Sequence, residues 1–173
     1  MPQTAETPTA APTVSHSTFV IERTYPSTPE KVFAAFADPT KKRRWFADRG
    51  THVSEEFTMD FRVGGVDYGR FRFQEGSRFP GVAFENTTTY QDIVPNRRIV
   101  FAYTMTFGDH RMSASLATVE LLPTDNGTNL IYTEQAAFFE GADGPEMRRE
   151  GWSKLLDSLD KELTSWRNQE PRS

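Results

Sequence analysis

The sequence predicts an α+β fold in which a curved antiparallel sheet wraps around one long C-terminal helix. Residues 151–166 place apolar side chains at helical spacing, with charged side chains on the opposite face. Residues 57–138 read as six strands separated by short turn signals. One helix covers a whole sheet only if the sheet curls around it, and that arrangement often leaves a cavity between them.

The chain is expected to form one domain over residues 19–168, with disordered ends at 1–18 and 169–173. A length of 173 residues suits a single domain, and no internal repeat or linker interrupts it. The first 18 residues are rich in Pro, Thr and Ala, and they lack the basic start and apolar core of a secretory signal. That composition is typical of a disordered leader.

The predicted domain begins with a strand and two short helices. Phe19–Tyr25 alternates and is rich in β-branched and aromatic residues, which indicates a strand. Thr28 is a candidate N-cap with Pro29 at the first helical position. Asp38, followed by proline, ends this helix and caps a second one that runs to Phe46.

The middle of the chain then changes to a period of two, and the short turns between its strands imply antiparallel neighbours. The six predicted strands cover residues 57–63, 68–73, 83–94, 99–107, 112–122 and 129–138. The last predicted element is the C-terminal helix, whose apolar stripe consists of Trp152, Leu155, Leu156, Leu159, Leu163 and Trp166.

Composition excludes several classes of function. A net charge of -4 gives no basic field for nucleic acid, and the basic run Lys41–Arg44 is interpreted as a solvated helix face. The absence of cysteine excludes disulfides, thiolate metal sites and a cysteine nucleophile, and fits a cytoplasmic protein. His16, His52 and His110 have no metal-ligand spacing, so neither metal nor cofactor is expected. No apolar run is long enough for membrane insertion.

Four stretches carry a resemblance to a known family: residues 33–39 with 44–46, residues 61–68, residues 93–101 and residues 150–159. Together they resemble the C-terminal domain of the activator of heat-shock protein 90 ATPase, a branch of the START-like or SRPBCC superfamily. The resemblance covers residues 19–168. It implies the helix-grip fold, with a pocket between the concave sheet face and the long helix.

Side chains of one parity on each strand point into such a pocket. A few polar groups in a mostly apolar cavity are typical of small-molecule sites. The candidate ligand-binding residues are Phe61, Phe71, Phe101, Tyr103, Met105, Ser115, Tyr132, Glu134, Trp152, Leu155 and Leu159.

Glu134 is the one candidate for catalysis, as a general base. The alternative is a Glu134 that is solvated near a strand end or paired with an arginine, because buried carboxylates are rare unless paired.

Three functions stay open from the sequence. The favoured hypothesis is a non-catalytic domain that binds a small apolar or aromatic molecule. The second is a cyclase-, dehydratase- or hydrolase-type enzyme acting on such a molecule, as in some START-like proteins. The third is a chaperone-accessory or stress interaction module, with a protein partner or a homodimer, which would expose an apolar patch outside the pocket.

Overall fold

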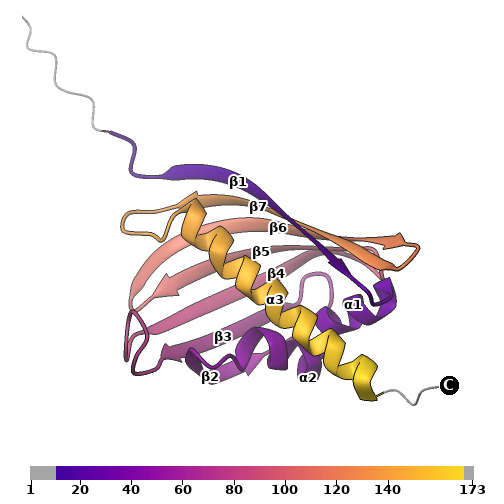
Figure 1. The fold of residues 1–173 in the computed structure, drawn as a ribbon. Coiled ribbons are helices and arrows are strands. Elements are labelled where there is room, and N and C mark those ends of the chain that lie inside the picture. Colours follow the sequence, from indigo (N-terminus) through magenta and orange to yellow (C-terminus); the bar gives the residue numbers. More distant parts are fainter. Residues whose placement is uncertain (1–10, 170–173) are drawn as a thin grey trace, which may run out of the picture.

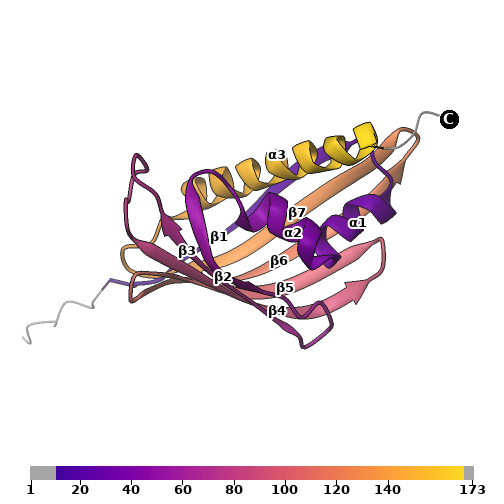
Figure 2. The ribbon, with the colours of Figure 1, turned by 90° about the horizontal axis from the view of Figure 1, so that it is seen from below.

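The computed structural model describes residues 11–169, and its seven strands form one antiparallel sheet that curves around a long helix (Figures 1 and 2). The elements are β1 (Ser15–Tyr25), α1 (Pro29–Ala37), α2 (Pro39–Lys42), the π-helical turn η1 (Arg43–Ala47), β2 (His52–Thr58), β3 (Val66–Phe73), β4 (Ala83–Val94), β5 (Arg98–Phe107), β6 (His110–Thr124), β7 (Gly127–Phe138) and α3 (Pro145–Gln169). The predicted α+β helix-grip fold is confirmed.

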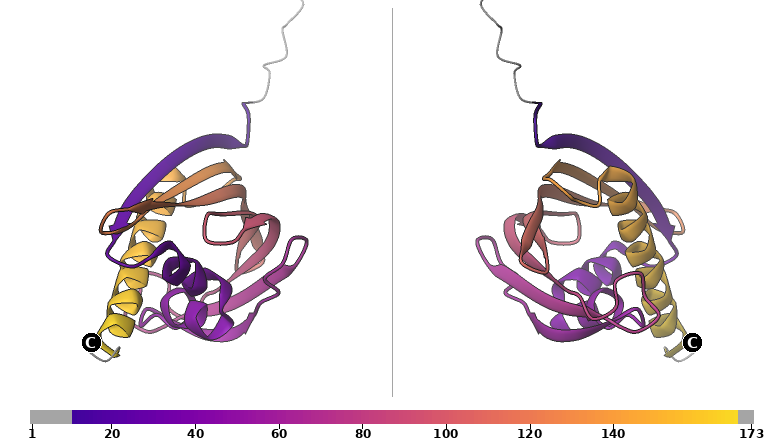
Figure 3. Two further views of the ribbon diagram at one scale, coloured as in Figure 1. Left: turned by 90° about the vertical axis from the view of Figure 1, so that its right-hand side faces the viewer. Right: turned by 90° about the vertical axis from the view of Figure 1, so that its left-hand side faces the viewer.

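The strand order β1-β7-β6-β5-β4-β3-β2 follows from the lengths of the connections. Short connections make β2 to β7 successive antiparallel neighbours. The first strand instead pairs with the last, from Ser15 opposite Phe138 to Tyr25 opposite Thr128. The helices α1 and α2 lie between β1 and β2 in the chain, and they sit beside α3 on the concave side of the sheet (Figure 3).

Local sequence explains where the short helices begin. The Thr28 hydroxyl accepts a hydrogen bond from the Lys31 amide at 3.4 Å, so α1 has the predicted N-cap. The Asp38 carboxylate accepts hydrogen bonds from the first free amides of α2, at 2.9 and 3.1 Å. The chain then continues into η1, where the indole of Trp45 donates to the Ala35 carbonyl at 2.8 Å. This contact fixes η1 against α1.

The core lies between α3 and the concave sheet face. On α3 the stripe side chains Trp152, Leu156, Leu159 and Leu163 are buried, whereas Leu155 and Trp166 are partly exposed. The inward parity predicted for β5, β6 and β7 agrees with the burial pattern of these strands. Period-two alternation therefore identified the concave face correctly on three of the seven strands.

Two element boundaries differ from the prediction at the ends of the chain. The strand β1 begins at Ser15, so residues 15–18, which were predicted as part of a disordered tail, pair with β7. These four residues are Ser, His, Ser and Thr, and they give no apolar alternation that would reveal a strand. The helix α3 reaches Gln169, one residue beyond the predicted domain. Residues 11–14 of the predicted tail form neither helix nor strand, and residues 1–10 and 170–173 lie outside the described residues.

The strand predicted at residues 57–63 was placed too far along the chain, because β2 spans His52–Thr58. The following segment turns sharply at Gly65, where a Cβ atom would lie only 2.0 Å from the Asp60 carbonyl oxygen, so only glycine fits there. This turn leaves Phe61 outside the sheet, with its ring centroid 4.9 Å from that of Tyr90. Phe61 therefore reaches the concave side from a loop.

Within residues 11–169, no helix combines the length and the apolar character needed to cross a membrane.

Candidate functional site

A cavity of about 780 Å³ lies on the concave side of the sheet, between strands β3, β4 and β5 and the helical elements η1 and α3. Aromatic side chains are the largest group in its walls because the inward positions of these strands carry Phe and Tyr. The aromatic lining residues are Phe36, Trp45, Phe46, Phe61, Phe71, Phe73, Phe79, Phe84, Tyr90, Phe101, Tyr103, Phe107 and Trp152.

The structure separates the candidate ligand-binding residues into two groups. The residues that line the cavity are Phe61, Phe71, Phe101, Tyr103, Met105, Trp152 and Leu155. The other four, Ser115, Tyr132, Glu134 and Leu159, are buried away from it. They lie where α3 packs closely on the sheet: the ring of Tyr132 stacks on that of Trp152, with 4.2 Å between centroids.

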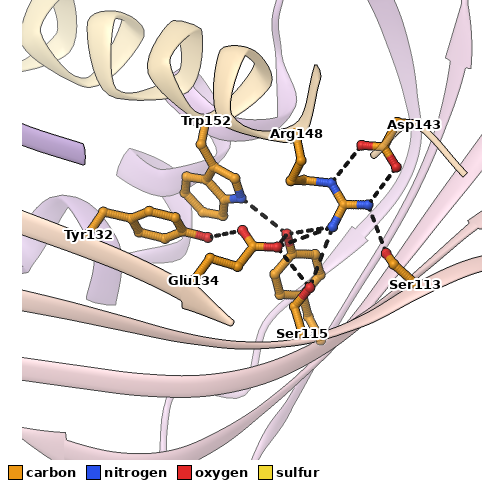
Figure 4. Close-up of polar contacts among 8 residues, drawn as sticks. Ser113, Ser115, Tyr132, Glu134, Asp143, Arg148 and Trp152 are labelled. Atoms are coloured by element: carbon orange, nitrogen blue, oxygen red, sulfur yellow. Dashed lines mark hydrogen bonds and ion pairs between the residues drawn. The ribbon is translucent and has the colours of Figure 1, made fainter. Parts of the chain in front are cut away.

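Glu134 is fully buried and forms the centre of a polar cluster (Figure 4). Its Oε1 accepts hydrogen bonds from the hydroxyls of Tyr103 at 2.8 Å and Ser115 at 2.7 Å. Its Oε2 accepts one from the Tyr132 hydroxyl at 2.7 Å. An ion pair with Arg148, at 3.2 Å from Nη1 to Oε1, balances the charge. The sequence left two alternatives to a catalytic Glu134: a solvated side chain, or one paired with an arginine. The structure shows the pairing with an arginine.

Arg148, in the first turn of α3, connects this cluster to the rest of the fold. Its Nε and Nη2 donate to both oxygens of Asp143 at 2.9 Å, and Nη2 also donates to the Ser113 hydroxyl at 2.7 Å (Figure 4). Burial alone would lower the pKa of Arg148, but Tyr103, Asp143 and Glu134 outweigh it, and the pKa is raised. The guanidinium therefore stays charged and holds the start of α3 against β6 and β7.

The cavity is lined by Tyr103, Asp143, Arg148 and Trp152 from this polar cluster, but not by Glu134. The Tyr103 hydroxyl accepts hydrogen bonds from Trp152 Nε1 at 3.2 Å and from Arg148 Nη1 at 3.1 Å, and it donates to Glu134. Burial, together with the Glu134 charge, raises the pKa of Tyr103. Tyr103 is thus a neutral, fully hydrogen-bonded wall group.

A second polar cluster lies at the η1 side of the cavity. Lys42 Nζ lies 3.0 Å from Asp67 Oδ2 and 3.1 Å from the Tyr90 hydroxyl, which itself donates to Asp67. Burial lowers the pKa of Lys42, and Asp67 offsets part of this effect. The interpretation of Lys41–Arg44 as a solvated face is therefore wrong at Lys42, which is buried.

His52 contributes a neutral imidazole to the cavity wall. Its Nε2 lies 2.9 Å from the Ala47 carbonyl oxygen and donates to it, and its Nδ1 accepts from the Thr51 hydroxyl at 3.3 Å. Burial lowers the pKa of His52 below its ordinary value of 6.5. His52 therefore binds a proton more tightly in the unfolded chain than in the folded protein.

This difference predicts a pH dependence of stability. The contribution of His52 is complete above pH 6.5 and is lost as the pH falls through the lower folded pKa. We expect the free energy of unfolding, measured by urea denaturation, to fall as the pH is lowered below 6.5. The neutral variant His52→Gln should show a smaller fall. Identical slopes for the two proteins would contradict the assignment.

Residues 26–164 match the family described as "Activator of Hsp90 ATPase homolog 1-like protein". The chain belongs to this family. A solved structure from Rhizobium loti is 50% identical, with a TM-score of 0.76, and covers 86% of this chain and 98% of its own. One from Rhizobium leguminosarum is 36% identical, with a TM-score of 0.82, and covers 88% and 97%.

A further match, an AHSA1-like protein from Aeromonas hydrophila, is 21% identical with a TM-score of 0.67 and covers 91% of this chain and 98% of its own. At that identity it shows the fold alone. A comparison with curated proteins gives no match. Membership in the Hsp90 ATPase activator homolog 1-like family thus agrees with the resemblance seen in the sequence.

Sequence reasoning missed two buried basic residues of this family member. Arg148 lies four positions before Trp152 and continues the apolar stripe of α3, so its position on that stripe was a usable signal of burial. Lys42 lies three positions before the buried Trp45, which gives a weaker signal in a short helix. In residues 11–169 no three His, Cys, Asp or Glu side chains gather as metal ligands.

Proposed function

We propose that this protein binds a small apolar or aromatic molecule in the cavity between the sheet and α3, without transforming it. The observation that carries the proposal is a cavity of about 780 Å³ walled by aromatic side chains. Small-molecule sites have volumes of about 300–1,000 Å³ and mostly apolar walls with few polar groups.

One wall position has an unused hydrogen-bonding atom. The side-chain oxygen of Asn86, on the inward face of β4, is buried and has no partner within the described residues. A buried acceptor without a partner costs about 1–3 kcal/mol. A ligand with an N–H or O–H group over β4 would recover this cost, so Asn86 supports a bound molecule with one donor group.

The hydrogen bonding of Glu134 favours binding over catalysis. Its carboxylate does not line the cavity, and it already interacts with Tyr103, Ser115, Tyr132 and Arg148. A general base must lie within hydrogen-bond reach of the proton that it removes. Glu134 instead supports the wall to which Tyr103 belongs.

The outer face of the sheet favours a small ligand over a docking role. Two of the exposed apolar residues on it have polar cross-strand neighbours on β7: Val20 lies opposite Thr133, and Leu116 opposite Gln135. Single exposed apolar side chains are ordinary on soluble proteins, whereas interaction sites are contiguous patches.

Binding can be tested with the neutral fluorescent probe N-phenyl-1-naphthylamine and two matched variants of β4. Thr88 lines the cavity, whereas its neighbour Thr87 is exposed on the other face. We expect Thr88→Trp to fill the cavity and weaken probe binding about tenfold or more, with Thr87→Trp close to the unchanged protein. Absence of probe binding, or an equal effect of both variants, would refute the proposal.

A further inference from the structure

The charges that line the cavity are unbalanced. The basic lining residues are Lys42, Arg49, Arg78, Arg148 and Lys154, whereas Asp143 is the sole acidic one in the described part of the chain. The whole chain carries a net charge of -4. A cavity of opposite sign to its protein attracts anions, because low-dielectric walls concentrate the field inside it.

Three of the five basic side chains already have acidic partners. Lys42 pairs with Asp67 at 3.0 Å. Arg148 pairs with Glu134 and Asp143 in the polar cluster of Figure 4. Lys154, whose side chain is largely exposed, pairs with Glu150 at 3.0 Å. Their charges are therefore balanced within the protein.

Arg49 and Arg78 have no acidic partner among residues 11–169. Arg78 is exposed on the β3–β4 loop, beside the ring of Phe79. Arg49 is partly buried between η1 and β2, close enough to His52 to influence its pKa. Water screens Arg78 more than Arg49, so an anion in the cavity gains most at Arg49.

The surroundings of Arg49 make its isolation unusual. Burial lowers the pKa of its guanidinium, and no nearby carboxylate opposes this effect. The neighbouring acid, Asp48, is engaged instead by Arg43 at 3.2 Å. A partly desolvated guanidinium has five N–H donors, and an oxyanion is the group that satisfies several of them at once.

We infer that the ligand is an apolar or aromatic molecule with one oxyanion group, of the carboxylate or sulfonate type, and that Arg49 binds this group while the aromatic walls hold the rest. This inference rests on the proposed function and specifies its ligand class. The proposed function alone requires only an apolar or aromatic ligand, whereas this inference also requires a negative charge on the ligand and its binding by Arg49.

A matched pair of probes separates charge from shape. N-phenyl-1-naphthylamine is neutral, and 8-anilinonaphthalene-1-sulfonate has the same rings with one sulfonate. We expect the sulfonate to bind more tightly to the unchanged protein. Arg49→Gln should weaken its binding about tenfold or more and leave the neutral probe within about twofold, since hydrogen bonds to charged groups are among the strongest. Added salt should weaken the sulfonate alone.

Three variants serve as controls. Arg44→Gln makes the same charge change at an exposed position of η1, outside the cavity lining, and should leave both probes unchanged. Arg78→Gln should have a smaller effect than Arg49→Gln. Arg49→Lys keeps the charge without the planar fork and should fall between the unchanged protein and Arg49→Gln. Thermal unfolding of each variant confirms that the domain is folded.

The outcomes distinguish the two proposals. If neither probe binds, the proposed function fails and the ligand class fails with it. If the neutral probe binds but the sulfonate is no tighter, or Arg49→Gln affects both equally, the oxyanion inference is overturned and the pocket stands. A displacement experiment tests the same inference with aliphatic molecules. Decanoate should displace the neutral probe better than decan-1-ol, and Arg49→Gln should remove that difference.

Discussion

Replacing Arg148 by methionine is expected to lower the free energy of unfolding by about 3–5 kcal/mol. The change keeps an apolar stem on α3 but removes the guanidinium from the fully buried Glu134. It also leaves Ser113 and Asp143 without their shared donor. Equilibrium urea denaturation followed by tryptophan fluorescence measures the loss.

Two further variants show whether the loss comes from the uncompensated charge. Lys154→Met makes the same substitution on the exposed side of α3 and should change stability by less than about 0.5 kcal/mol. Adding Glu134→Gln to Arg148→Met should restore about 1–3 kcal/mol, because no unpaired carboxylate then remains at the centre of the cluster. Simple additivity of the two changes would show that Glu134 and Arg148 are not coupled.

Leu159→Ala should cost about 2–5 kcal/mol of stability. Leu159 is fully buried between α3 and the sheet, so its removal loses apolar burial and leaves a void that the close-packed interior fills only in part. Because Leu159 does not line the cavity, probe affinity of the folded variant should stay unchanged.

The exposed Lys161 provides the matched comparison on the same helix. Lys161→Ala removes a long side chain without opening the core and should stay within about 0.5 kcal/mol of the unchanged protein. Equal thermal midpoints for the Lys161 and Leu159 variants would mean that the apolar stripe of α3 has been assigned to the wrong face.

Periodicity made the architecture predictable. The alternation in β5, β6 and β7 assigned the inward face correctly because one face of each strand packs on the core. Where side chains do not alternate, the signal vanishes: the first four residues of β1 are polar and were missed, although they pair regularly with β7. Phe61 was assigned to a strand because apolar alternation continues past the end of β2 into a loop.

The candidate site was predictable only in its apolar part. Phe71, Phe101 and Trp152 were placed on the cavity by strand parity and helix spacing. The polar clusters depend on tertiary contacts: Arg148 meets Glu134, 14 positions away, through the junction of α3 with β7. Nothing local distinguishes such a paired cation from the unpaired Arg49, since the difference lies in which acids the fold brings near.

The pairing of the first strand with the last has a consequence for how the chain folds. Thr128 at the start of β7 hydrogen-bonds the Ser27 carbonyl just after β1, and the two residues are 101 positions apart. Closing so long a loop is entropically costly and gives the fold a high contact order. A ribosome must therefore synthesise nearly the whole domain before β1 finds its neighbour. Until then β1 has no strand to pair with, and the nascent chain is most exposed to wrong strand pairing at that stage.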